Sequence, residues 1–201
     1  MQQFSTAISY LLHPLFIPLS GTSAYFIISP KFIPTSFQAA TILPIFLLTI
    51  IIPILSYILL KHLGIVSSVF MPNLRERKYP LYLNLGLLLL VLLKVIPNHY
   101  SVELHYYFLG LVAASFSALF LLFINFKCSM HLMGLGSLLM FLINLSIHFE
   151  INIAIAIAIM TLLCGLTATA RLYLRAHTAP ELIIGFLLGV ATQLLTVKFW
   201  L

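Results

Sequence analysis

Charge is the scarcest property of this sequence. Only 7% of its 201 residues are charged and 62% are hydrophobic, whereas a water-soluble domain carries about a quarter charged residues. This composition excludes a water-soluble globular domain and indicates a polytopic membrane protein. Because each crossing needs about 20 apolar residues, we expect an all-α helical bundle of six to seven transmembrane helices, forming a single integral-membrane domain over residues 1–201.

Acidic residues and cysteines are also few. Four acids and two cysteines offer neither a cage for magnesium nor a disulfide framework, so we expect no metal and no cofactor. The ten Lys and Arg residues are scattered between apolar runs, which favours an anionic lipid or substrate as partner and argues against nucleic acid. The first of them is Lys31, so the N-terminal apolar run lacks the cationic segment of a signal peptide and is expected to be the first membrane helix.

Apolar runs predict the positions of the spans. They lie at about Phe4–Ile28, Ala39–Leu60, Leu81–Ile96, Leu104–Phe126, His131–Phe149, Ile151–Ala170 and Leu182–Trp200. The first two spans contain Pro14, Pro18, Pro44 and Pro53. Kinks are expected there, because neighbouring helices and water can satisfy the carbonyl groups that proline leaves unpaired.

Most of the charge gathers in four polar stretches that connect the spans. These stretches are Lys61–Pro80, Lys94–His105, Lys127–His131 and Arg171–Glu181. Two predicted crossings separate the first from the third, and two more separate the third from the fourth. Because an even number of crossings returns the chain to the same side, these three are expected to share one membrane face, with the second stretch on the other.

The three same-face stretches combine histidines, arginines and glutamate. Guanidinium groups bind phosphoryl oxygens with two parallel donors, and imidazoles act as nucleophiles and as general acids. Convergence of these groups at a bilayer surface therefore predicts a phosphate site whose chemistry needs no metal.

The last of these stretches carries a motif with a known counterpart. The spacing Arg171-x5-His177-x3-Glu181, followed by Gly185 and Gly189, resembles the third signature of the type 2 phosphatidic acid phosphatase superfamily, Ser-Arg-x5-His-x3-Asp. The resemblance extends over roughly residues 75–189 and implies a phosphatase-like core at about 71–200 of the chain. This third signature is its most specific part.

A second motif lies upstream at the predicted distance of two crossings. Ser129-Met130-His131 is similar to the second signature of the same superfamily, Pro-Ser-Gly-His, with Cys128 and Met130 in place of its proline and glycine. The order of the two motifs along the chain also agrees with the superfamily.

The sequence departs from the superfamily pattern at three places. The first signature, Lys-x6-Arg-Pro, is not reproduced: when its proline is placed on Pro80, Tyr79 and Pro72 stand at its arginine and lysine. Glu181 replaces the usual aspartate, and Ala170 replaces the serine. The cations of the first signature are therefore expected from neighbouring positions that are out of register.

The resemblance implies a role for each matching residue. The histidine matching His177 attacks phosphorus, the acid matching Glu181 holds the other nitrogen of that imidazole, and the histidine matching His131 protonates the leaving group. These three are the catalytic residues that the resemblance implies. The substrate-binding residues that we expect are Arg171, Arg77, Lys78, Arg75 and Ser129.

The function implied by the resemblance is a metal-independent phosphatase. It would hydrolyse a membrane lipid phosphate or diphosphate through a phosphohistidine, in a bacterial inner membrane with the active site facing the periplasm. Two alternatives stay open. The missing first signature is compatible with a protein that binds lipid phosphate without turnover, and polar residues inside spans, such as Lys94 and Asn144, are compatible with a small transporter.

Structural roles are also expected for several of these residues. Thr178-Ala179-Pro180-Glu181 is typical of a capping box that starts a helix, and we expect Glu181 both to cap that helix and to contact His177. Lys127 and Arg175 are expected to be interfacial residues at helix ends.

The remaining histidines have no partner at a useful spacing and are expected in aromatic belts or packing positions. They are His13, His62, His99, His105 and His148. Close contacts between helices are expected at four glycines, of which the last two form a small-residue packing face. These glycines are Gly134, Gly136, Gly185 and Gly189.

Overall fold

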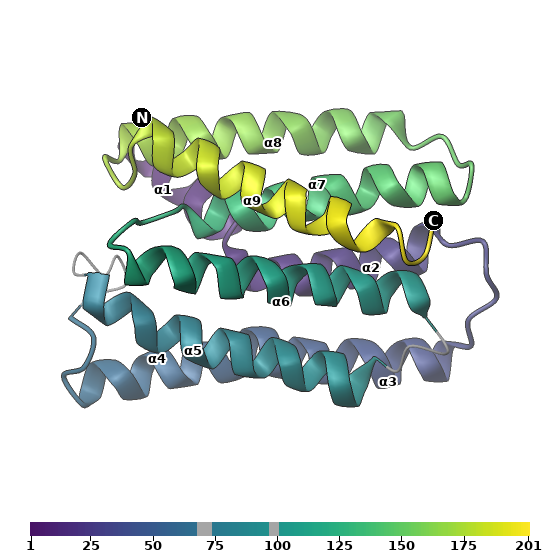
Figure 1. Ribbon diagram of the computed structural model, residues 1–201, viewed down its shortest axis with the longest axis horizontal. Helices are drawn as coiled ribbons and strands as arrows, with labels where there is room; N and C mark the ends of the chain where they lie inside the picture. Colours follow the sequence, from purple (N-terminus) through teal and green to yellow (C-terminus); the bar gives the residue numbers. More distant parts are fainter. Residues whose placement is uncertain (68–73, 97–100) are drawn as a thin grey trace.

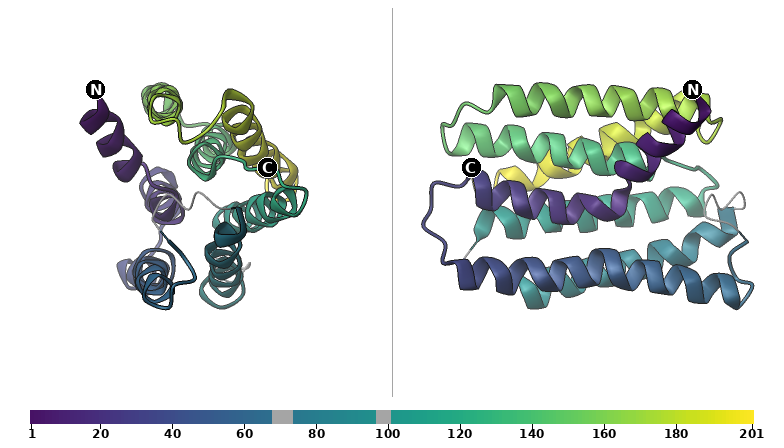
Figure 2. Two further views of the ribbon diagram at one scale, coloured as in Figure 1. Left: turned by 90° about the vertical axis from the view of Figure 1, so that its left-hand side faces the viewer. Right: turned by 180° about the vertical axis from the view of Figure 1, so that it is seen from behind.

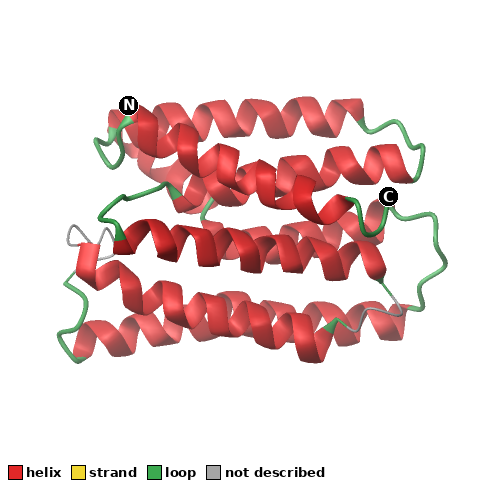
Figure 3. Cartoon of the chain, in the orientation of Figure 1, coloured by secondary structure: helices red, strands yellow, loops and turns green. Residues whose placement is uncertain are grey.

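The computed structural model describes residues 1–67, 74–96 and 101–201 of the chain, except for the side chain of Arg75. Its helices are α1 Gln2–Leu11, η1 Pro14–Phe16, α2 Ile17–Ile28, α3 Thr35–Phe46, η2 Leu47–Ile51, α4 Ile52–His62, α5 Leu74–Leu90, η3 Val91–Val95, α6 Val102–Phe123, α7 Met130–His148, α8 Ala154–Tyr173 and α9 Ala179–Val197. Figure 3 shows these helices without any strand in the described ranges. The all-α prediction is confirmed.

Seven of the helical segments in the described ranges are long and apolar enough to cross a membrane. They run side by side in alternating directions (Figure 1). The C-terminal ends of α4, α6 and α8 lie at the same end of the bundle as the N-terminal ends of α5, α7 and α9. We call this the site end, and the other the opposite end. The described residues of the three polar stretches predicted to share one face lie at the site end.

The first span is broken rather than kinked. Helix α1 ends at Leu11, a single 3-10 turn follows at Pro14–Phe16, and α2 begins at Ile17. The residue before a proline disfavours helical backbone angles, and His13 is extended, with φ −68° and ψ 140°. Figure 2 shows α1 leaning away from the direction of α2 as a result.

The third span begins earlier than the sequence predicted. We expected it at about Leu81, with residues before Pro80 in a connection, but α5 starts at Leu74 and contains Pro80. Inside a helix, proline has no N–H to donate to the carbonyl group four residues earlier, and a membrane helix tolerates this loss where neighbouring groups or water satisfy that carbonyl. The consequence is that Arg77 and Lys78 lie on the surface of a helix, so helical phase decides which of them faces the bundle interior.

Helix α7 lies at the centre of the bundle and packs most closely on α9. A Cβ atom at Gly185 would lie 2.6 Å from the carbonyl oxygen of Ser129, and one at Gly189 would collide with the backbone of Met133. The predicted close packing at these glycines is confirmed. It brings the start of α7, which carries His131, against the start of α9.

Candidate active site

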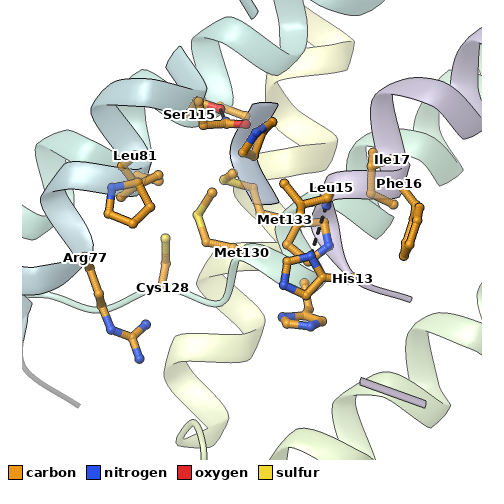
Figure 4. A pocket seen from close by; sticks show the side chains of 18 of the residues that line it. His13, Leu15, Phe16, Ile17, Arg77, Leu81, Ser115, Cys128, Met130 and Met133 are labelled. Carbon is orange, nitrogen blue, oxygen red and sulfur yellow. Dashed lines mark hydrogen bonds between the residues drawn. The ribbon is translucent and has the colours of Figure 1, made fainter. Parts of the chain in front are cut away.

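A cavity of about 620 Å³ opens among the helices at the site end. Its histidine, lysine and arginine side chains come from segments that are distant in sequence, as Figure 4 shows in part. These side chains belong to His13, Arg77, Lys127, His131, Arg171 and His177. The same cavity continues along α5 to Leu88, eleven residues beyond Arg77, which at 1.5 Å per residue is about 16 Å deeper into the bundle. Its deeper lining is mainly apolar, which suits a ligand with a polar head and an apolar tail.

His177 and Glu181 form the closest polar pair at this cavity. The Nδ1 atom of His177 lies 2.6 Å from the Oε2 atom of Glu181, so the predicted contact is present. Helix α9 starts with the predicted capping box, in which Thr178 and Glu181 satisfy each other's backbone N–H groups. The local sequence therefore places the carboxylate one helical turn after the histidine, where it accepts a hydrogen bond from the Nδ1–H group.

Burial and charge keep the imidazole of His177 neutral at pH 7. Burial lowers the pKa of His177 below its ordinary value, and the hydrogen bond to Glu181 opposes this shift. The positive charges of Arg171, Lys127 and Arg77 lower the pKa further. With its proton on Nδ1, the neutral ring presents an unprotonated Nε2, which is the form that a nucleophile requires.

Lys127 does more than the sequence predicted. We expected an interfacial residue, but its Nζ atom donates to the carbonyl oxygen of Ala176 at 3.0 Å and lies 3.4 Å from Oε2 of Glu181. The backbone N–H of Ser129 also donates to the carbonyl oxygen of Glu181 at 3.0 Å. Hydrogen bonds therefore join the connection before α7 to the segment that carries His177 and Glu181.

Arg171 is the most deeply buried cation at the cavity. It lies in the last turn of α8, only 7% of its surface is exposed, and its Nε atom has no hydrogen-bond partner among the described residues. A buried charged donor without a partner costs free energy unless a ligand satisfies it. Arg77 lines the same cavity from α5, so two guanidinium groups belong to the cavity lining.

The other predicted substrate-binding residues lie elsewhere. Lys78 packs its ammonium group over the ring of Phe123, 4.6 Å from the ring centre, and does not line the cavity in the described structure. The hydroxyl of Ser129 accepts a hydrogen bond from the N–H of Leu132 and caps α7. Arg75 has a side chain outside the described residues, so its predicted role stays a prediction.

His131 lines the cavity together with His13, for which the sequence predicted only a packing or belt position. The Nε2 atom of His131 donates to the carbonyl oxygen of Ser9 at 3.0 Å. The ring of His13 meets the ring of His131 edge to face, with 5.3 Å between the centres. The sequence held one signal for His13, since a polar residue before a proline inside a span marks a break and often a functional site.

The cavity contains a cysteine that is unsuited to act as a nucleophile. Burial raises the pKa of Cys128 to about 11, so its thiol stays protonated at neutral pH, whereas the thiolate is the reactive form. Within the described ranges, no three His, Cys, Asp or Glu side chains gather closely enough to hold a metal ion. The reactive nitrogen of His177 is therefore the strongest nucleophile that the described residues bring to the cavity.

Comparisons with known proteins yield no match for this chain. No family model matches it, and no curated protein or solved structure matches it. The function of the cavity is therefore inferred from its residues.

Proposed function

We propose that the protein is a metal-independent phosphatase of a membrane lipid phosphate or diphosphate, which acts through a phosphohistidine, as its resemblance to the type 2 phosphatidic acid phosphatase superfamily implies. One observation carries the proposal. A neutral histidine held by a carboxylate shares a cavity with three cations, and that cavity continues into an apolar interior. The histidine, the carboxylate and the cations are the groups needed for attack on phosphorus, and the apolar interior accommodates a lipid tail.

The first half of the reaction forms the phosphoenzyme. Nε2 of His177 attacks phosphorus, an N–P bond forms, and the P–O bond to the lipid leaving group breaks. Glu181 accepts the Nδ1–H bond and stabilises the positive charge that develops on the ring. His131 enters this step as a cation favoured by the bound phosphate, and transfers a proton to the departing oxygen. Because Nε2 of His131 donates to Ser9, the transferred proton comes from Nδ1.

The second half returns the enzyme to its starting state. Water attacks phosphorus while neutral His131 accepts a proton from it, so the same residue acts first as acid and then as base. The N–P bond breaks, its electron pair returns to Nε2 of His177, and orthophosphate leaves. Both histidines then carry the protons with which they began.

Three cations balance the charge of the bound phosphate in this scheme. Arg171 supplies the unpaired Nε donor, Arg77 a second guanidinium, and Lys127 an ammonium shared with Glu181. Charge-assisted donors of this kind stabilise the equatorial oxygens of the transition state. The missing first signature is therefore replaced by Arg77 together with Lys127, and Lys78 is not needed.

The proposed orientation places the site end on the periplasmic side of a bacterial inner membrane. Cations at the site end, such as Arg77, Lys127 and Arg171, are assigned to phosphate binding, so they are discounted when the positive-inside rule is applied. Labelling tests this orientation in a chain without native cysteines. Arg175→Cys should react with an impermeant thiol reagent in intact cells, and Phe32→Cys should react only after lysis; the reverse pattern would refute the orientation.

The central experiment measures phosphate release by purified protein from vesicles that contain a lipid phosphate, in EDTA. We expect release to continue, because no step is assigned to a metal. Activity that depends on added magnesium would refute the mechanism. Binding of lipid phosphate without release would support the non-catalytic alternative, and substrate movement across sealed vesicles without release would support a transporter.

A further inference from the structure

The mechanism assigns no role to His13. It lies in the break of the first span, is half-buried, and lines the cavity beside His131. Figure 4 shows it approaching from the N-terminal segment, while Arg77 approaches from the other side with Cys128 between them in this view. His13 is thus placed across the cavity from one of the proposed phosphate ligands.

The backbone fixes the tautomer of His13. Its Nδ1 atom accepts a hydrogen bond from the N–H of Leu15 at 3.3 Å and caps the turn η1. Nδ1 is therefore unprotonated, and the proton of the neutral ring lies on Nε2. Protonation of Nδ1 would place two donors against each other and break the cap. Consequently His13 is held as a neutral N–H donor and is not a source of protons.

The Nε2–H of His13 belongs to a side chain that lines the cavity. Within the described ranges, the hydrogen bond of the His13 side chain is made through Nδ1, which leaves the Nε2–H for a ligand in the cavity. Two other groups of the cavity are donors: Nε2 of His131 donates to Ser9, and the guanidinium of Arg171 lines the same cavity. Several donors and cations around one cavity favour an anionic ligand that accepts from more than one of them.

We infer that His13 is a substrate-binding residue whose Nε2–H donates to a non-bridging oxygen of the bound phosphate, and this inference rests on the proposed function. The first span thereby supplies a phosphate ligand that lies outside both motifs. Its role differs from that of His131, because His13 contributes a fixed hydrogen bond and no proton transfer. The expected effect is on phosphate affinity.

Two substitutions separate the donor role from the capping role. In His13→Gln the side-chain amide nitrogen reaches the place of Nε2, so the donor is kept. In His13→Asn the side-chain oxygen takes the place of Nδ1, so the cap is kept and the donor is lost. The exposed His62 at the site end provides a matched control, His62→Asn. The readouts are the Kd of inorganic phosphate for the purified proteins and the KM for a lipid phosphate.

We expect His13→Asn to weaken phosphate binding about tenfold, equivalent to ~1.4 kcal/mol, with His13→Gln and His62→Asn within about threefold of wild type. Equal losses in both His13 variants would assign the residue to packing and overturn the inference, as would wild-type affinity in His13→Asn. The binding assay needs no turnover. A wild type that binds phosphate through His13 without hydrolysis would therefore refute the phosphatase and leave this site intact.

A spectroscopic measurement on the wild type covers the case in which either variant fails to fold. In protein with 15N-labelled histidine, added phosphate should shift the Nε2 resonance of His13 and leave its Nδ1 resonance unprotonated. An Nε2 resonance that does not respond to saturating phosphate would overturn the inference.

Discussion

The two ends of the bundle use similar residues for different purposes. At the opposite end, Glu103 is only 2% exposed and its carboxylate is surrounded by donors. The hydroxyl of Tyr25 donates to it at 3.1 Å, Nε2 of His148 lies 3.2 Å away, and the ammonium group of Lys31 pairs with it. One lysine, one tyrosine and one histidine thus surround one acid within the protein.

At the site end the balance is reversed. Glu181 accepts from His177 and lies near Lys127, but Arg171 and Arg77 add two further positive charges to the same cavity. One guanidinium nitrogen has no partner among the described residues. A buried cluster that is satisfied internally stabilises a fold, whereas one that has surplus donors is completed by a ligand. This contrast is the physical reason for assigning function to the site end alone.

The largest expected effect is a loss of turnover that occurs on substitution at the site end and not at the opposite end. His177→Ala should reduce phosphate release at least about 1,000-fold, because no other described nucleophile replaces the lost nitrogen. His148→Ala, at the opposite end, and His62→Ala should retain turnover within about threefold per folded molecule. Rates of phosphate release from vesicles that contain a lipid phosphate test this prediction. Wild-type turnover in His177→Ala would mean that His177 and Glu181 have only a structural role at the start of α9.

A smaller effect on turnover distinguishes two neighbouring cations at the site end. Arg77→Gln should lower turnover at least about tenfold, the equivalent of roughly 1.4 kcal/mol, because its guanidinium lines the cavity. Lys78→Gln should have little effect, because its ammonium group packs on Phe123. Steady-state rates of the two variants provide the test, and the opposite ranking would mean that α5 presents a different face to the substrate.

The smallest effect on turnover is expected at the opposite end. Glu103→Gln removes the negative charge and replaces one accepting oxygen with an NH2 donor, so at least one of the surrounding donors loses its partner. The free energy of unfolding should fall by about 1–3 kcal/mol, with kcat unchanged. The exposed Glu150 gives the matched control, Glu150→Gln, which should leave both quantities near wild type. Thermal unfolding and kcat are measured on the same samples. A large loss of kcat in Glu103→Gln would show that the two ends are coupled.

Local patterns predicted the most specific part of the candidate site. The contact between His177 and Glu181 follows from a spacing of four residues at a helix start, and the capping box fixes that start independently of tertiary structure. The common face of the three polar stretches follows from the number of crossings alone. Both inferences depend on features that a membrane helix imposes on its own sequence.

Contacts across the bundle were not predictable in the same way. His13 and His131 are brought together by the exact direction that α1 takes after the break, and no spacing rule encodes that direction. The choice between Arg77 and Lys78 depends on the residue at which α5 starts, and Pro80 suggested a start that was too late. Lys127 resembled an ordinary interfacial lysine because its partner belongs to a different connection.

The double engagement of Glu181 restricts how this position can vary in evolution. Its carboxylate caps α9 and also holds His177. Glutamine would satisfy the helix start without the negative charge, and aspartate would keep the charge on a side chain that is one methylene shorter. Glutamine thus keeps the helix cap but loses the charge that holds His177, and aspartate keeps the charge but shortens the side chain. A substitution at position 181 therefore needs a compensating change in the connection that carries His177.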